Sequence, residues 1–329
     1  MKFNHCLAIL FCLPLLCQGE EARAPSPQSK RHAVPGLTYF VQREDTGGCG
    51  SAFLLEDTNG VWLVSNVHVF SGSTNLTIIN VEGNTIQVPP QIEVAKDRDI
   101  IRFRTDLPKG LPLSPSCEYD EIIYAYGDSG GAGVLTRLKG KAVALGPDLI
   151  EISADIIPGN SGGPVVNEDG EVVGVSSSLL RHNLPDWIAD GTRFADTRRM
   201  AIRLNDIEWE PVDFSEFYRQ TFALKKMEDF LRLAIYAAVV LSDDITNTLI
   251  ISTDNQKFQS WLKKHNRCAT KKSERSLKMN IRKLGRMLQG MEDDPAPECE
   301  ITIQFLKDKL ADINDACAAV RKQAELLEE

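Results

Sequence analysis

The chain has 329 residues, more than the roughly 250–300 at which a single hydrophobic core stops growing, so more than one domain is expected. Hydrophobic residues make up 43% and charged residues 25%, as in ordinary globular proteins. The net charge of −9 argues against an electrostatic grip on nucleic acid by the whole chain, and no nucleic-acid partner is expected.

Residues 1–19 have the pattern of a signal peptide. Lys2 precedes an apolar run from Cys6 to Cys17, which is shorter than the roughly 20 residues that span a bilayer. Gly19 then precedes two glutamates, so we expect cleavage after Gly19 and export to the periplasm or the exterior. The alternative is a retained anchor helix, and no later stretch is long enough to cross a membrane. Residues 20–36 are rich in Pro, Ser, Arg and Lys and predict a flexible lead-in.

The cysteines do not define a disulfide framework. Five would remain after cleavage, namely Cys49, Cys117, Cys268, Cys299 and Cys317. Because five is odd, at least one is unpaired or bonds another chain. We expect no metal site and no cofactor.

Residues 37–210 have the texture of a β-domain. Short apolar runs alternate with turn signals, and Asn59-Gly60 lies between two of them, which is typical of a tight hairpin. Asp169-Gly170 divides a later pair in the same way. Many short strands with Gly-rich turns indicate a sandwich or barrels. A Pro-rich stretch near residues 106–120 divides the region into halves at about 37–110 and 111–210.

Residues 211–329 predict a helical domain. Asp213 and Glu216 provide an acidic cap and a capping-box partner for a helix start. Three apolar series then recur at spacings of three and four and predict three helices that bury their stripes together as a bundle. The series are Leu224 to Leu241, Leu277 to Leu288, and Cys299 to Val320.

Two serines lie in Gly-x-Ser-Gly-Gly strings, Ser129 in "YGDSGGAGV" and Ser161 in "PGNSGGPVV". A catalytic serine needs a base, an acid that orients the base, and N–H groups for the oxyanion. His68 ends the apolar run "VWLVSNVHVF", where a strand can hold a base rigidly, and Asp99 heads the next apolar run. Asp97 is the alternative acid.

The spacing separates the two serines. Ser129 follows Asp99 by only 30 residues, half of them in the Pro-rich stretch, which leaves too little chain for a second barrel before the nucleophile. Ser161 follows Asp99 by 62 residues, and a hairpin comes directly after it. We therefore expect His68, Asp99 and Ser161 to be catalytic and Ser129 to be a structural turn residue.

At this point "SNVHVF", "DRDIIRF" and "PGNSGGPVVNEDGEVVGV" resemble the His, Asp and Ser blocks of trypsin-like serine proteases, closest to the HtrA/Deg type. The resemblance covers about residues 37–205. It implies an all-β protease domain of two packed antiparallel β-barrels with the site between them, here followed by the α-helical bundle. It also implies an oxyanion hole formed by the N–H groups of Gly159 and Ser161.

The resemblance has departures and a further consequence. The HtrA type normally carries a PDZ domain, whereas this chain continues with helices. Digestive trypsins have an Asp before the nucleophile that pairs with a newly cut N-terminus, and Asn160 stands there instead. The residue six before the nucleophile, Asp155, corresponds to the bottom of the primary pocket. A buried carboxylate there would favour Arg or Lys before the scissile bond. In the rival view Asp155 turns away and small aliphatic residues are preferred.

The expected function is that of an exported serine endopeptidase acting on proteins or peptides through an acyl-enzyme. One alternative is a catalytically silent protease-like binding protein. The other is an α/β-hydrolase esterase, because residues 159–163 also fit Gly-x-Ser-x-Gly. Ten Lys or Arg and a single acid lie between Lys263 and Arg286, as in a solvated basic helix face or a docking surface. The helical domain is also where self-association or a partner is expected.

Overall fold

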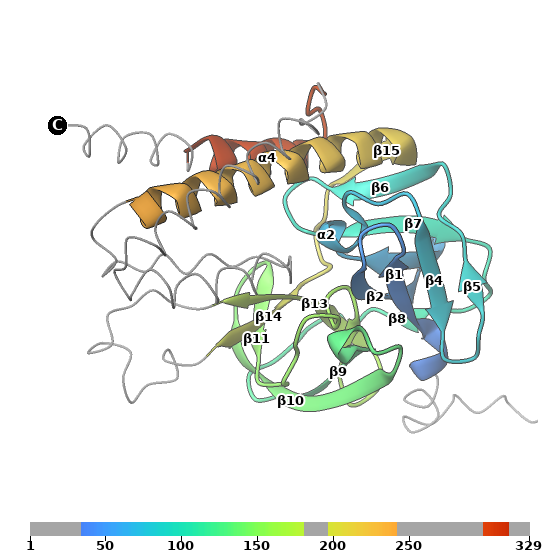
Figure 1. Cartoon of the computed structure of the whole chain (residues 1–329). Helices are drawn as coiled ribbons and strands as arrows, with labels where there is room; N and C mark the ends of the chain where they lie inside the picture. Colours follow the sequence, from blue (N-terminus) through green and yellow to red (C-terminus); the bar gives the residue numbers. More distant parts are fainter. Residues whose placement is uncertain (1–33, 181–196, 242–298, 316–329) are drawn as a thin grey trace, which may run out of the picture.

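The computed structural model describes residues 34–180, 197–241 and 299–315 (Figure 1). The second of the three predicted helices, at 277–288, lies outside these residues. So do the basic stretch 263–286, Cys268 and Cys317. Side chains are described up to residue 177 in the last strand before the first gap, and up to residue 229 in the long helix.

The described strands form two sheets. The first sheet has the order β15-β6-β7-β3-β2-β1-β4-β5, with β8 paired to β2. Its strands are β1 (Thr38–Arg43), β2 (Gly48–Asp57), β3 (Gly60–Ser65), β4 (Leu76–Asn80), β5 (Thr85–Ile86), β6 (Gln91–Ala95), β7 (Ile101–Thr105), β8 (Leu111–Pro112) and β15 (Trp209–Asp213). A short 3-10 helix, η1 (Pro35–Leu37), precedes β1.

The second sheet is a closed barrel in the order β10-β11-β14-β13-β12-β9. Its strands are β9 (Ile122–Asp128), β10 (Leu135–Leu145), β11 (Leu149–Ile152), β12 (Pro164–Val166), β13 (Val172–Leu180) and β14 (Arg198–Ile202). The expected all-β fold is therefore present, with one closed barrel. The other predicted barrel is instead a curled open sheet (Figure 1).

The pairing excludes the α/β-hydrolase alternative. That fold requires a parallel sheet with helices between its strands. Here every ladder in the described residues is antiparallel except the short pairing of β2 with β8.

Strand β2 is buried on both faces, with a separate core on each. Successive side chains of a strand point to opposite faces, so β2 contributes to both cores. In β2, Ala52 and Leu54 join a core inside the first sheet. Phe53 and Leu55 face the other way and pack with residues of the barrel such as Tyr126 in a second core. The two sheets are therefore joined by a continuous apolar contact, and the barrel interior forms a third core.

The boundary expected at residue 210 falls inside β15, which pairs with β6 of the first sheet. The chain thus returns from the barrel to the first sheet before the helical region begins. The Asp213 cap is present, since its Oδ1 accepts hydrogen bonds from the N–H of Ser215 at 2.9 Å and of Glu216 at 3.4 Å. The Glu216 carboxylate binds Arg219 and Gln220 rather than closing the expected capping box.

Helix α4 (Phe214–Leu241) follows this cap and confirms the first predicted helix. The last predicted helix begins later than expected: residues 304–315 are helical, and Cys299 lies before the helix. Both segments contribute to the core of the first sheet: the buried residues are Phe217, Ala223, Leu224, Ile301, Ile303, Phe305, Leu306 and Ile313. These parts of the helical region therefore pack on the first sheet. No helix in the described part of the chain is both long and apolar enough to span a membrane.

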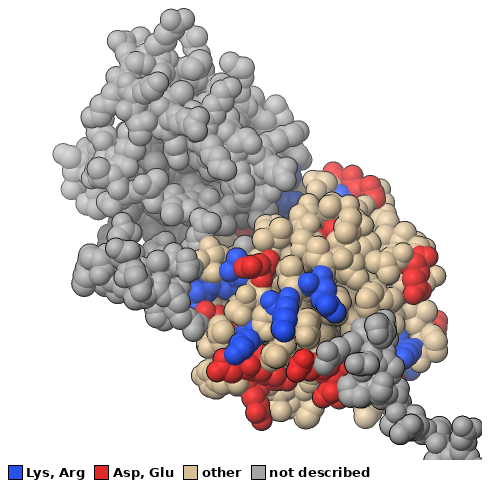
Figure 2. Space-filling view, turned by 90° about the horizontal axis from the view of Figure 1, so that it is seen from below, with Lys and Arg blue, Asp and Glu red and all other residues tan. Residues whose placement is uncertain are grey.

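Charges of both signs lie together on the barrel surface. Strand β10 carries the exposed cations Arg137, Lys139 and Lys141, and Lys141 pairs with Asp120 at 3.3 Å. The view from below shows a group of basic side chains bordered by acidic ones (Figure 2).

Candidate active site

His68 lies in a one-turn helix, α2 (Val67–Phe70), rather than in the strand that the sequence predicted. Strand β3 ends at Ser65, and Asn66 then adopts an extended conformation that starts the helix. The side chain of Asn66 is fully buried and donates to the carbonyl of Asp99 at 2.7 Å. The helix start is therefore tied to the loop that carries the candidate acid.

Asp99 binds His68 through both of its carboxylate oxygens. Oδ1 accepts the backbone N–H of His68 at 3.0 Å, and Oδ2 lies 2.6 Å from the imidazole Nδ1. Backbone N–H groups in the first turn of a helix have no partner within the helix, so this carboxylate also caps α2. The imidazole is half exposed, at 46%, and is held by its Nδ1 edge.

Asp97 is engaged elsewhere. Its carboxylate pairs with Arg98, with an Nη2–Oδ2 distance of 2.6 Å, and this hydrogen bond holds the pKa of Asp97 below its usual range. The buried Arg98 also contacts Asp148 at 3.2 Å and donates to the carbonyls of Arg203 and Asn205. Of the two candidate acids, Asp99 is therefore the one in contact with His68.

Ser161 follows a tight loop that requires glycine. Gly159 has φ +102°, and a Cβ there would lie 2.0 Å from the carbonyl oxygen of Asp128. Gly162 has φ +85°, and a Cβ there would lie 2.0 Å from the carbonyl oxygen of Ser51. Both positions combine a left-handed backbone with close contact to a neighbouring strand, so only glycine fits.

The loop leaves two N–H groups available. Neither Gly159 nor Ser161 donates its N–H to an acceptor among the residues that the structure describes. Their carbonyl groups are engaged: Ser51 Oγ donates to the carbonyl of Gly159 at 2.8 Å, and Ser51 N donates to the carbonyl of Ser161 at 2.7 Å. The peptide planes are thus fixed while these donors remain open to a ligand oxygen.

Ser177 in β13 connects Ser161 with the His68–Asp99 pair. The Ser161 hydroxyl donates to the carbonyl of Ser177 at 3.0 Å, and the Ser177 hydroxyl lies 3.5 Å from Asp99 Oδ2. A Cβ on Gly50 would lie 2.6 Å from Val69, the neighbour of His68, and 3.2 Å from the carbonyl oxygen of Ser161. His68, Asp99 and Ser161 therefore converge on one place at the junction of the two sheets.

Ser129 lies beside this loop, and its hydroxyl is bound by neighbouring side chains. It begins the 3-10 turn η2 (Ser129–Gly131), and its hydroxyl lies 2.6 Å from Thr136 Oγ1 and 3.0 Å from Asn160 Oδ1. The fully buried Asn160 amide oxygen also accepts the N–H of Ile157 at 3.0 Å. The first Gly-x-Ser-Gly-Gly string thus packs against the second.

Sequence reasoning missed two residues of this site. Ser51 bridges the two loops, because its hydroxyl donates to Gly159 and accepts the N–H of Asp128 at 2.9 Å. Ser177 is the middle residue of three consecutive serines. The alternation of side chains along a strand is the only sequence signal that could distinguish Ser177 from Ser176 and Ser178. No sequence motif identifies Ser51.

Asp155 is not the buried carboxylate that a basic preference would need. Its side chain is 82% exposed and pairs with Arg199 of β14 at 3.1 Å. Arg199 also donates from Nε to the carbonyl of Ile156 at 3.3 Å. The pair neutralises the charge at the surface, which agrees with the rival view that Asp155 turns away.

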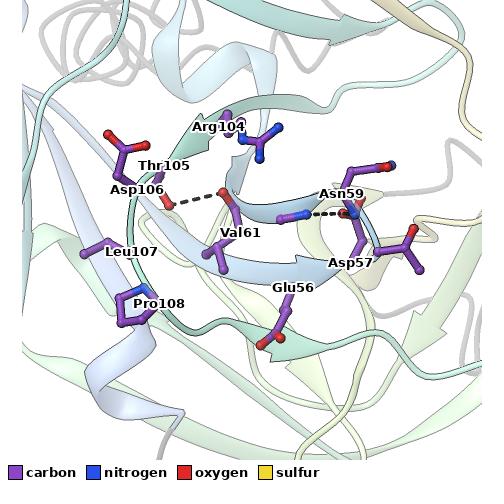
Figure 3. A pocket seen from close by; sticks show the side chains of 11 residues that line it. Glu56, Asp57, Asn59, Val61, Arg104, Thr105, Asp106, Leu107 and Pro108 are labelled. Carbon is purple, nitrogen blue, oxygen red and sulfur yellow. Dashed lines mark hydrogen bonds between the residues drawn. The ribbon is translucent and has the colours of Figure 1, made fainter.

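Two other features lie apart from this site. A cavity of about 500 Å³ lies at the β2–β3 turn and the chain after β7, and its lining includes Asp57, Asn59, Arg104 and Asp106 (Figure 3). None of His68, Asp99 and Ser161 lines it.

The described cysteines, Cys49, Cys117 and Cys299, are all free thiols. In the described residues, no group of three or more His, Cys, Asp or Glu side chains is arranged to hold a metal ion.

Known proteins share sequence similarity with the part of the chain that carries these residues. Residues 50–175 match the family described as "Trypsin-like peptidase domain". Protease Do-like 1 from Arabidopsis thaliana is 27% identical over 194 residues, covering 51% of this chain and 43% of that protein. Serine protease HTRA1A from Danio rerio is 30% identical over 154 residues, covering 42% of this chain and 32% of that protein. A solved structure, the HtrA-type protease AlgW with tripeptide, overlaps at a TM-score of 0.40 and 22% identity, covering 55% of this chain and 60% of that one.

Residues 50–175 are therefore similar to trypsin-like peptidase domains. The curated relatives that this region matches are named as HtrA or Do-like serine proteases. The chain spans less than half the length of these curated relatives.

Proposed function

We propose that this chain is a serine endopeptidase in which Ser161 is the nucleophile, His68 the general base and Asp99 the residue that orients the base. The observation that carries the proposal is the contact of Asp99 with both the backbone and the Nδ1 of His68. With its proton on Nδ1 facing the carboxylate, the imidazole has its basic lone pair on Nε2. That is the nitrogen required to take a proton from a serine hydroxyl.

The proposed reaction starts with a rotation of the Ser161 side chain. In this conformation its hydroxyl donates to Ser177, and it must turn to give its proton to His68 Nε2. Such contacts often tighten only once substrate is bound. The serine oxygen then attacks the scissile carbonyl, and the N–H groups of Gly159 and Ser161 stabilise the negative charge on the carbonyl oxygen.

Collapse of this intermediate breaks the peptide C–N bond, and His68 returns the proton to the leaving amine. The acyl group remains on Ser161. A water molecule gives a proton to His68 and attacks the ester carbonyl. The bond between the acyl carbon and Ser161 Oγ then breaks, His68 returns the proton to Oγ, and the second product leaves as a carboxylic acid. The Asp99 carboxylate stabilises the imidazolium, which forms once in each half of the reaction.

Two further expectations belong to this proposal. The exposed pair of Asp155 with Arg199 argues against a preference for Arg or Lys before the scissile bond, and we expect small aliphatic residues there. Residues 1–19 act as a signal peptide that exports the enzyme. N-terminal sequencing of the chain recovered outside the cytoplasm tests this expectation, and we expect the sequence to begin at Glu20. The signal-peptide assignment is wrong if Met1 is retained.

The proposal is tested by incubating a random peptide library with the chain and with Ser161→Ala. We expect cleavage by the parent chain and a loss of at least about 10³-fold in rate for Ser161→Ala, since a catalytic serine and its base act as a unit. No cleavage by a folded parent chain would contradict the proposal and favour a catalytically silent binding protein. The same library reports the residue preferred before the cut.

A further inference from the structure

The orientation of His68 depends on the surroundings of α2. A helix of four residues is too short to be stable alone, so its direction is set by packing. Val67, Val69 and Phe70 are all buried in the core of the first sheet. Whatever completes that core also determines where the imidazole lies.

Segments outside the matched family region complete this core. The family match ends at residue 175, whereas Phe217 and Leu224 of α4 and Ile303 and Phe305 beyond it belong to the same cluster as α2. Figure 1 shows α4 running along this side of the first sheet, with the red segment that contains residues 299–315 beside it.

The loop directly after α2 is bound to α4. The N–H of Gly72 donates to Thr221 Oγ1 at 3.1 Å in a buried hydrogen bond. The Thr221 hydroxyl in turn donates to the carbonyl of Phe217 at 2.8 Å. A Cβ on Gly72 would lie only 3.2 Å from the Lys225 side chain, so the loop and the helix are in direct contact.

The opposite side of this loop is held by β1. Arg43 Nη1 donates to the carbonyl of Ser71 at 3.2 Å, and the N–H of Ser71 donates back to the carbonyl of Val67 at 3.0 Å. Arg43 Nη1 also lies 3.5 Å from the carbonyl oxygen of His68. The end of α2 is therefore held by Arg43 of the first sheet and by Thr221 of α4. Only the contact with Thr221 comes from the helical region.

The next residue back on α4 fixes the second segment. Gln220 is fully buried, and its Oε1 accepts the N–H groups of Thr302 at 2.8 Å and Ile303 at 3.1 Å. Its Nε2 donates to Thr302 Oγ1 and to Glu216, each at 2.7 Å. Gln220 and Thr221 thus connect residues 299–315, α4 and the loop of the candidate base in series.

We propose that α4 and residues 299–315 form a brace that holds His68 in place, with Thr221 as a positioning residue for the reaction. The proposal rests on the proposed function, because it assigns the brace to the catalytic base. Removing the Thr221 oxygen leaves the buried N–H of Gly72 without an acceptor, and such a group costs free energy until the loop shifts to find one. A shift of α2 then moves the imidazole away from Ser161.

The test compares Thr221→Val, which keeps the shape and loses the oxygen, with Thr221→Ser, which keeps the oxygen. Arg219→Ala on the exposed face of the same helix is the control for helix substitution. We expect Thr221→Val to lower kcat about ten-fold with KM within about two-fold, because small misplacements of catalytic groups are costly. Thr221→Ser and Arg219→Ala should stay within about two-fold of the parent.

Amide hydrogen exchange over residues 66–74 provides a readout that does not depend on activity. Exchange there should be faster in Thr221→Val and unchanged in Thr221→Ser. If Thr221→Val does not fold, Thr302→Ala, which removes an exposed partner of Gln220, should give the same change to a smaller extent. Unchanged exchange, or wild-type kcat in folded Thr221→Val, would overturn the brace. Faster exchange in a chain that cleaves no peptide would overturn the proposed function alone.

Discussion

At the scale of single residues, hydrogen-bond partners distinguish two serines that share one motif. Ser161 lies after a loop with two open N–H groups and points toward Ser177 near the His68–Asp99 pair. The Ser129 hydroxyl is engaged by Thr136 and by the amide oxygen of Asn160. Ser129 therefore supports the residue that precedes the proposed nucleophile, a role that its spacing in the sequence does not reveal.

Ser129→Ala should lower peptide hydrolysis by about three- to ten-fold without abolishing it. The substitution removes one of the two donors to the buried Asn160 oxygen, and a lost hydrogen bond of this kind is worth about 0.5–1.5 kcal/mol. Steady-state kinetics beside Ser161→Ala provide the measurement. Equal and complete loss in both variants, with both folded, would show that the two serines have been assigned incorrectly.

At the scale of elements, β15 and α4 belong energetically to the first sheet. Val212 of β15 and Phe217 of α4 are buried in the same core as α2. A domain boundary near residue 210 would cut through β15 and separate α4 from the first sheet. A chain that stops there would expose part of that core.

Phe217→Ala should lower the free energy of unfolding by about 3–5 kcal/mol, the usual range for a buried phenylalanine. Phe217 is fully buried and stacks on Phe214, with ring centroids 6.0 Å apart. Urea unfolding of the full chain measures the effect, with the exposed Arg219→Ala as control. A change below about 1 kcal/mol would mean that α4 folds independently of the sheet.

The elements that the sequence predicted well are those with strong local signals. Asn59-Gly60 marks the β2–β3 turn, and Asp213 caps α4, because each acts within a few residues. The pairing of β15 with β6 was missed, since it joins residues more than 100 positions apart and β15 contains Pro211. The helical state of His68 was also missed, because the cap that starts α2 comes from Asp99 and is a tertiary contact.

The candidate site follows the same division. The residue types and order of His68, Asp99 and Ser161 could be read from the sequence, and the structure places Asp99 against His68. The exposure of Asp155 could not be read, because it depends on Arg199 from a different strand. Self-association through the helical region stays a prediction.

At the scale of the whole molecule, Arg98 ties the first sheet to the chain that leaves the barrel. It is almost fully buried and contacts Asp97 beside it, Asp148 after β10, and the carbonyls of Arg203 and Asn205 after β14. This connection lies next to Asp99. It therefore fixes the proposed acid relative to the barrel that carries Ser161.

Asp97→Asn should destabilise the protein at neutral pH and have less effect in acid. The hydrogen bond from Arg98 lowers the pKa of Asp97 in the folded state. A lowered folded pKa stabilises the protein above the unfolded value, about 3.9, and this contribution is lost as pH falls through the folded pKa. Urea midpoints at pH 7 and below pH 3, with the exposed Asp106→Asn as control, give the test. A difference that grows on acidification would contradict the sign.

The most direct measurement of the central claim is covalent labelling with a fluorophosphonate followed by peptide mapping. We expect one phosphonyl group per chain on Ser161, formed at least about 10²-fold more slowly in His68→Ala because the base is missing. An adduct on Ser129, or labelling of Ser161 at an unchanged rate in folded His68→Ala, would contradict the account.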